Sequence, residues 1–414
     1  MAQVSGFRGI RYNPAMVQLE SVLAPPYDVI SPKLQQDLYG RAMQNVVRLE
    51  LGRDFESDVA GERDRYTRAR DYLGVWLAEG ILIQDDQASV YIHRHSFRPP
   101  GGGGPRERLG YFVGVEPVPY DRRQILRHEL TLKAPKADRV RLLQTTRAQT
   151  SPVFLLYENS DEVTSELLRL SSAAPPAAEA VTQGEHGSER HQLWRVSDPT
   201  AVAGITSALS RTRLFIADGH HRYETALQVG LTQVLALVSP IDSEANVILP
   251  THRVVPDAGI GVDDLAQALT SAGWRIQRSA GLEEALLTIS SLRRIDHAFV
   301  VASASGRVVV SRARRGNGAR SPRQGLDVTV LESEILEPLL GISLADEAAG
   351  RLLYSRDAEE AVEWAVSKHG LAFLVNPPSV AEMTAVALAD EAMPQKSTYF
   401  FPKVPAGLVI MTID

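Results

Sequence analysis

The order of hydrophobic and polar positions in the first part of the chain predicts strands that alternate with helices. Residues 88–97 and 108–118 alternate between apolar and polar side chains, which predicts a β-hairpin with four consecutive glycines in its connection. Ser31-Pro32 predicts the start of a helix over 33–39, because Ser is a good N-cap and Pro fits the first helical position. The same patterns predict two further elements, a strand at 45–51 and a long helix at 56–80.

The later part of the chain repeats the alternation. The segment 173–187 is rich in Ala and Pro and predicts a linker, whereas an apolar strand at 214–217 leads directly into a helix at 220–229. This order predicts a mixed α/β (α+β) protein of several lobes with mixed sheets. Its expected divisions are an N-terminal α/β lobe at 1–158, a core segment at 189–257 and a C-terminal α/β lobe at 258–414.

The segment from Asp218 to Arg222 lies where the predicted strand meets the predicted helix. The first helical turn has unpaired NH groups and the positive end of the helix dipole, so it binds anions readily. Gly219 lets a ligand approach the backbone, and Arg222 can bind a phosphate through two parallel hydrogen bonds. His220 and His221 add donors, and we expect both, with Asp218, to act in catalysis. Asp218 either holds Mg²⁺ beside the phosphate or simply caps the helix.

Three further groups of polar residues are candidates. Lys133, Lys136 and Arg139 flank a proline and are expected to bind nucleotide phosphates, unless they form a solvated basic face. His252 and Arg253 follow a strand and are expected to complete the anion site, unless His252 is a structural histidine. Asp28 is either a general base or a turn-stabilising residue. His93 and His95 are two positions apart, so a strand places both on one face, and we expect that face to be solvated.

Composition narrows the possible functions. The 44 basic and 50 acidic residues give a net charge of -6, which argues against nucleic-acid binding. The absence of cysteine excludes thiolate chemistry and disulfides. No apolar run is long enough for a signal peptide or a membrane span, so we expect a cytoplasmic protein without a membrane partner. Only six of the basic residues are Lys, which marks Lys136, Lys396 and Lys403 as unusual.

Four segments, at 24–31, 217–226, 250–253 and 393–400, resemble those of a prokaryotic domain-of-unknown-function family, numbered ten-fifteen. In addition, the Asp-Gly-His-His-Arg turn is similar to the phosphate-binding turn of the ParB/sulfiredoxin superfamily, which includes free-serine kinases. This resemblance implies a ParB-like strand-turn-helix core that binds ATP or ADP with Mg²⁺. It also implies that Gly219, His220, His221 and Arg222 hold phosphate and that Asp28 is the upstream acid. Sulfiredoxin chemistry is excluded because it needs a cysteine.

These features predict a nucleotide-dependent phosphotransferase that acts on a small hydroxyl metabolite, with free serine as the first candidate. One alternative is a regulatory module that binds nucleotide without turnover. Another is a structural or assembly protein. The sequence leaves the oligomeric state open.

Overall fold

The chain folds as two compact units, described by a computed structural model that covers residues 2–131, 133–158, 160–314, 321–347 and 349–413. The first unit comprises Met1–Arg127, Thr131–Val247 and Phe400–Asp414, and the second comprises His128–Leu130 and Ile248–Tyr399. The mixed α/β class predicted from the sequence is confirmed. The three-part division at 158, 189 and 257 stays a prediction. Among the described residues, every helix is too short or too polar to cross a bilayer.

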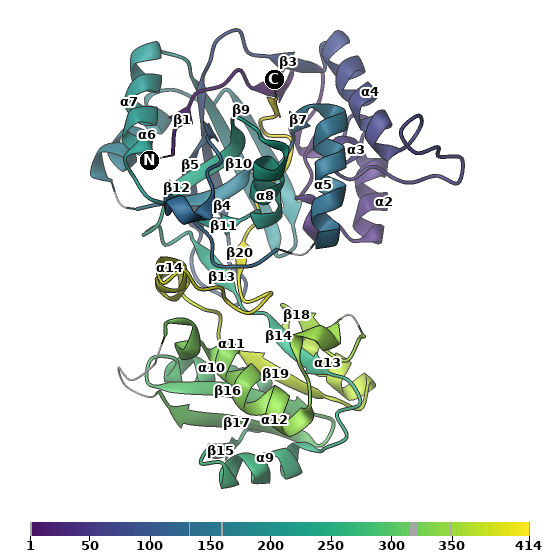
Figure 1. Cartoon of the computed structure of the whole chain (residues 1–414), viewed down its shortest axis with the longest axis vertical. Coiled ribbons are helices and arrows are strands. Elements are labelled where there is room, and N and C mark those ends of the chain that lie inside the picture. Colours follow the sequence, from purple (N-terminus) through teal and green to yellow (C-terminus); the bar gives the residue numbers. More distant parts are fainter. Residues whose placement is uncertain (1, 132, 159, 315–320, 348, 414) are drawn as a thin grey trace. The chain divides into compact units, whose positions relative to one another are not determined.

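A nine-stranded mixed sheet forms the centre of the first unit (Figure 1). Its order is β6-β11-β8-β12-β5-β4-β10-β9, with β1 paired to β5. The pairs β11–β6 and β12–β8 are parallel, and the other pairs are antiparallel. The strands are β1 (Val4–Ser5), β4 (Val90–Phe97), β5 (Arg106–Val115), β6 (Ile125–Leu126), β8 (Val153–Tyr157), β9 (Ala178–Gly184), β10 (Gly187–Val196), β11 (Leu214–Asp218) and β12 (Val234–Pro240).

Helices of the first unit bury one face of this sheet. Tyr111, Val113 and Leu155 of the strands pack in one apolar cluster with Leu167 of α6 (Asp161–Ala173) and Leu209 of α7 (Pro199–Ser210). Two small sheets complete the unit, β2 (Ile10–Tyr12) with β3 (Leu82–Gln84) and β7 (Ala148–Gln149) with β21 (Met411–Thr412). The helices are α1 (Leu19–Val22), α2 (Pro32–Arg41), α3 (Val47–Glu50), α4 (Arg65–Ala78), α5 (Lys133–Thr146), α6 (Asp161–Ala173), α7 (Pro199–Ser210) and α8 (His220–Val229).

An antiparallel sheet with the order β15-β17-β16-β19-β14-β18 organises the second unit. Along β16, Phe299 and Val301 face α9, whereas Ala298 and Val300 face α10 and α13, as period-two alternation requires. The strands are β14 (His252–Val255), β15 (Arg275–Arg278), β16 (Asp296–Ser303), β17 (Gly306–Ala313), β18 (Leu353–Ser355) and β19 (Leu371–Val375). The helices are α9 (Val262–Ser271), α10 (Leu282–Leu292), α11 (Asp327–Leu331), α12 (Glu337–Leu340), α13 (Ala358–Ser367) and α14 (Val380–Leu388).

Local predictions are confirmed where local chemistry determines the element. The hairpin is β4 and β5, and α2 begins where the Ser31 hydroxyl accepts a hydrogen bond from the Leu34 amide at 3.2 Å. The helix expected at 56–80 is shorter, because α4 spans only Arg65–Ala78 and begins at the Asp64 cap. Two other predictions are wrong. Residues 45–51 contain α3 instead of a strand, because the buried Asn45 side chain accepts from the Val47 amide at 3.0 Å and starts a helical turn. The expected linker at 173–187 contains β9, whose small polar residues form an edge strand.

Candidate functional site

The turn between β11 and α8 is held by its glycine and by an arginine one helical turn later. Gly219 occupies the N-cap position with φ 91° and ψ 27°, in the left-handed region that favours glycine, and no side chain caps the helix. A Cβ atom at this position would lie 3.1 Å from Cζ of Arg222. Asp218 therefore does not cap α8, and the guanidinium of Arg222 folds back over the turn.

Asp218 forms a largely buried ion-pair network. Its carboxylate accepts a hydrogen bond of 2.6 Å from Nη2 of Arg222 and another from Nζ of Lys403. These side chains are only 10–15% exposed. Burial alone would raise the pKa of Asp218, but the charges of Lys403 and Arg222 outweigh it and hold the pKa below its usual range. The carboxylate is thus ionised with both oxygens occupied, and the magnesium role expected for Asp218 stays a prediction.

Glu224, in the first turns of α8, is hydrogen-bonded to a hydroxyl and to two cationic side chains. Its carboxylate accepts hydrogen bonds from the Thr131 hydroxyl at 2.5 Å and from Nζ of Lys136 at 3.0 Å, and Nη1 of Arg127 lies 3.5 Å away. Burial works against ionisation of Glu224, but these donors lower its pKa overall. Lys136, expected to bind phosphate, is therefore next to the predicted site and paired with an acid of α8.

Glu50 at the end of α3 joins the loop at 27–28 to this region. Only 2% of Glu50 is exposed, and its carboxylate accepts hydrogen bonds from the Tyr27 amide at 3.2 Å and from the Thr150 hydroxyl. Nη1 of Arg139 donates to the Glu50 carbonyl at 2.9 Å, and the guanidinium of Arg139 stacks 4.0 Å from the centre of the Tyr27 ring. Glu50 is not among the predicted site residues, because the pattern of residues 45–51 predicts a strand instead of α3.

Asp28 is the acid that remains available to a ligand. It is exposed, and its carboxylate accepts no hydrogen bond from the described residues. The charge of Asp28 acts on both His221 and Arg222, so the structure brings this loop close to the turn. Burial lowers the pKa of His221 more than Asp28 and Glu224 raise it, and its imidazole is neutral at neutral pH. A free carboxylate beside a neutral imidazole suits proton transfer.

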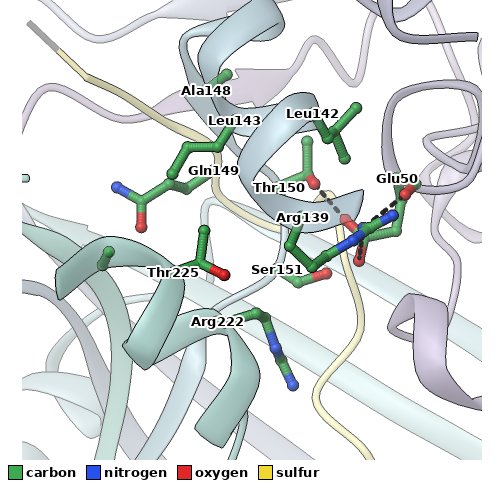
Figure 2. Close-up of a pocket in the computed structure, with 11 residues that line it drawn as sticks. Glu50, Arg139, Leu142, Leu143, Ala148, Gln149, Thr150, Ser151, Arg222 and Thr225 are labelled. Carbon is green, nitrogen blue, oxygen red and sulfur yellow. Dashed lines mark hydrogen bonds and ion pairs between the residues drawn. The ribbon is translucent and has the colours of Figure 1, made fainter. Parts of the chain in front are cut away.

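A pocket lies between α5, α8 and the segment 148–151. Its volume is about 50 Å³, and its lining includes Arg139, Ser151, Arg222 and Thr225 (Figure 2). Among the described atoms, the Ser151 hydroxyl, the Thr225 hydroxyl and Nε of Arg222 are buried without a hydrogen-bond partner. Buried polar atoms normally have partners, so these three are candidates for contacts with water or with a ligand. Ser151 and Thr225 are not among the predicted site residues, because a lone Ser or Thr carries no sequence signal for a binding site.

The other predicted site residues are placed as follows. His220 is buried at the first position of α8. The side chain of Lys133 lies outside the described residues. His252 and Arg253 belong to the second unit, where Nδ1 of His252 accepts from the Val375 amide at 3.2 Å and burial lowers the His252 pKa to about 4. Their role beside the turn stays a prediction.

Comparisons with known proteins give one family and several distant structural likenesses. Residues 4–329 match the model of the family described as "Protein of unknown function (DUF1015)". No curated protein sequence matches the chain.

The structural likenesses include a mutant free serine kinase in complex with AMP, with 13% identity and a TM-score of 0.38, covering 75% of this chain and 96% of that one. A mutant free serine kinase in complex with ADP also has 13% identity and a TM-score of 0.38, covering 75% of this chain and 97% of that one. A conserved hypothetical protein from Pyrococcus furiosus has 13% identity and a TM-score of 0.34, with 72% of this chain and 95% of that one covered.

Proposed function

We propose that this chain, which belongs to the DUF1015 family, binds nucleotide phosphate at the Asp218–Arg222 turn and transfers a phosphoryl group to a small hydroxyl metabolite. The observation that carries this proposal is the set of unpartnered polar atoms in the pocket. Figure 2 shows the hydroxyls of Ser151 and Thr225 in the part of the pocket next to Arg222. Two hydroxyl groups and a guanidinium NH are donors suited to phosphate oxygens.

The size of the pocket limits what it holds. A volume of about 50 Å³ exceeds the roughly 10–15 Å³ that one water needs, but it is far below the roughly 300–1,000 Å³ of pockets for drug-sized ligands. The pocket therefore suits a phosphate-sized group, and the nucleoside part of a nucleotide would lie outside it. Both Nη atoms of Arg222 are bonded to protein oxygens, of Pro152 and Asp218, so Nε is the guanidinium donor that would contact a phosphate oxygen there.

The transfer uses residues with separate roles. The substrate hydroxyl oxygen forms a bond to phosphorus, the bond from phosphorus to the nucleotide oxygen breaks, and the hydroxyl proton passes to the exposed carboxylate of Asp28. Arg222 and Lys403 offset the charge on the transferring group. Mg²⁺, when bound, would supply further charge neutralisation, with Asp218 as its predicted ligand after release of one oxygen from Lys403.

A regulatory module without turnover is the second candidate, and one observation favours it. Both oxygens of Asp218 are hydrogen-bonded to cationic side chains, so the turn as folded offers no free carboxylate to a metal ion. Under this alternative, nucleotide binding changes the behaviour of the protein while no product forms.

Mass spectrometry of phosphoserine distinguishes the two candidates. Purified protein is incubated with serine, Mg²⁺ and either ATP or ADP, and an authentic free serine kinase is assayed in parallel. We expect nucleotide-dependent phosphoserine that Arg222→Ala abolishes and that Arg211→Ala, a change at an exposed arginine after α7, leaves intact. A nucleotide-induced increase in melting temperature without any product supports the regulatory module. If neither phosphoserine nor an increase in melting temperature is observed, the nucleotide proposal is refuted.

A further inference from the structure

Three buried histidines meet on neighbouring strands of the first unit's sheet, and none of them lines the pocket. His93 and His95 point from β4, and His191 of β10 is paired with His95 in the strand register. At least one ring nitrogen of each lies within 4.8 Å of a ring nitrogen of both others. All three are at most 1% exposed. The expectation that His93 and His95 lie on a solvated face is therefore wrong.

Aromatic side chains explain this burial. Phe112 of β5 lies 5.7 Å from the His93 ring, and Phe97 lies 5.4 Å from the His95 ring, measured between ring centres. Phe97 in turn contacts Phe401, which belongs to the last segment of the first unit. Phe97 and Phe112 belong to the same hairpin as His93 and His95, but Phe401 comes from a distant part of the chain, so alternation along β4 could not reveal the whole cover.

The spacing of the polar atoms is close to that of metal ligands. Nε2 of His93 lies 3.2 Å from Nδ1 of His191, and Nε2 of His95 lies 2.9 Å from Oε2 of Glu189. Ligand atoms around a tetrahedral zinc ion, with bonds of about 2.0–2.1 Å, are separated by about 3.3–3.4 Å. Small side-chain shifts would therefore bring these atoms to coordination distance.

A glycine on the neighbouring strand makes room for the acid. A Cβ atom at Gly184 of β9 would lie only 1.9 Å from Oε1 of Glu189, so no other residue fits there with Glu189 in this position. The carboxylate is thereby able to turn inward toward His95. Glu189 is only 9% exposed, so a cation bound beside it would offset the cost of burying its carboxylate.

A neutral imidazole has one ring nitrogen with a lone pair, which serves either a metal or a hydrogen bond. In His95 the Nδ1 atom accepts from Arg108, so a metal at that nitrogen would have to displace this hydrogen bond. Imidazole ligands favour zinc and the later transition metals, whereas Mg²⁺ prefers oxygen.

We propose that His93, His95 and His191 bind one divalent transition-metal ion, zinc being the best match, with Glu189 as its acidic partner. This site uses other residues and other ligand chemistry than the proposed phosphate site, although the charge of Asp218 also acts on Arg108. The alternative is a purely hydrogen-bonded histidine cluster, in which Nε2 of His191 pairs with the Thr182 hydroxyl at 3.1 Å.

Arg108 is the group that opposes a cation here. Its Nη2 donates to Nδ1 of His95 at 3.1 Å and to the Pro402 carbonyl at 2.7 Å. A bound metal ion would be repelled by this guanidinium and would compete with it for His95. Removing the charge should therefore tighten metal binding, whereas removing a metal ligand should weaken it, and no purely structural cluster predicts both effects.

Cobalt(II) and zinc titrations of metal-free, untagged protein test the proposal. We expect one equivalent of Co²⁺ with visible d–d absorption, displaced by one equivalent of Zn²⁺. The pair of substitutions His93→Gln and His191→Gln should lower the affinity by more than about 100-fold, and His369→Gln, at an exposed residue of the second unit, should leave it unchanged. Arg108→Gln should raise the affinity about tenfold.

Three results would overturn the proposal. The first is wild-type protein that binds neither ion in the micromolar range, a result that does not depend on any variant folding correctly. The second is an unchanged Co²⁺ spectrum in the double histidine variant. The third is weaker binding in an Arg108→Gln protein whose circular dichroism matches that of the wild type.

Discussion

The pairing of Lys403 with Asp218 is open to a direct test by Lys403→Met, which keeps the length of the side chain and removes its charge. Lys403 and Asp218 are 185 positions apart in the sequence, and their side chains are 10% and 15% exposed. Removing one partner of a buried ion pair typically costs about 3–5 kcal/mol. Because Arg222 remains hydrogen-bonded to Asp218 at 2.6 Å, we expect a loss near the lower limit, about 3 kcal/mol.

The loss of unfolding free energy in Lys403→Met should depend on pH, because it depends on whether Asp218 is ionised. The folded-state pKa lies below the ordinary value of 3.8, so ionised Asp218 stabilises the fold fully above about pH 4. That contribution decreases as the pH falls through the folded-state pKa. In Lys403→Met the Asp218 pKa rises, so Asp218 becomes protonated at a higher pH than in the wild type. The difference in unfolding free energy between wild type and variant is therefore largest at neutral pH and decreases in acid.

Calorimetric unfolding at pH 7 and at pH 3 measures both effects. A loss of about 3 kcal/mol corresponds to a decrease in melting temperature of roughly 6–12 °C for a unit of this size. Lys33→Met, at an exposed lysine of the same unit, is the matched control. In an Asp218→Asn background, Lys403→Met should be neutral or stabilising, because no carboxylate remains to be paired. An equal loss at both pH values, or a loss no larger than that of the control, would refute the reasoning.

Three further predictions follow from the same region. Gly219→Ala should lower stability by about 1–3 kcal/mol in thermal unfolding, because Gly219 has a positive φ and a Cβ atom there would contact Arg222. The control Gly204→Ala, inside α7 with open space around it, should not lower stability. Glu50→Gln should lower stability by about 1–3 kcal/mol and reduce any nucleotide-induced increase in melting temperature, since it weakens the contacts to the 27–28 loop. Asp28→Asn should reduce phosphoserine formation by about 10²–10⁴-fold in the mass-spectrometric assay while nucleotide binding persists, and unchanged turnover would exclude Asp28 as the base.

The parts of the fold that the sequence predicts correctly depend on short-range chemistry. The Ser31 cap lies three residues from the amide that it accepts from, and the β4–β5 hairpin joins neighbours in the chain. The passage from β11 through Gly219 to α8 is likewise visible as an apolar run, a glycine and a helical pattern. In each case the residues that determine the conformation are within a few positions of one another.

The missed residues depend on the order of strands in the sheet. His191 joins His93 and His95 only because β10 pairs with β4, and their positions are almost a hundred residues apart. Glu50 contacts Thr150 across a similar separation. Lys403 carried one signal, the scarcity of lysine in the chain, but its partner could not be inferred before the last segment was placed in the first unit.

The position of Lys403 also changes the electrostatic argument for the turn. Asp218 by itself would repel a phosphate, and the sequence-based expectation was that Mg²⁺ between them would neutralise this repulsion. In the folded chain the Asp218 carboxylate is paired with two cations, Arg222 and Lys403, so its repulsion of a phosphate is offset without any metal ion. The carboxylates of Asp28 and Glu50 also act on Arg222, so these cations are not an uncompensated surplus of charge. Under the proposed function, phosphate binding at the turn would therefore not require a metal to neutralise Asp218, and Mg²⁺ would have the separate task of assisting transfer.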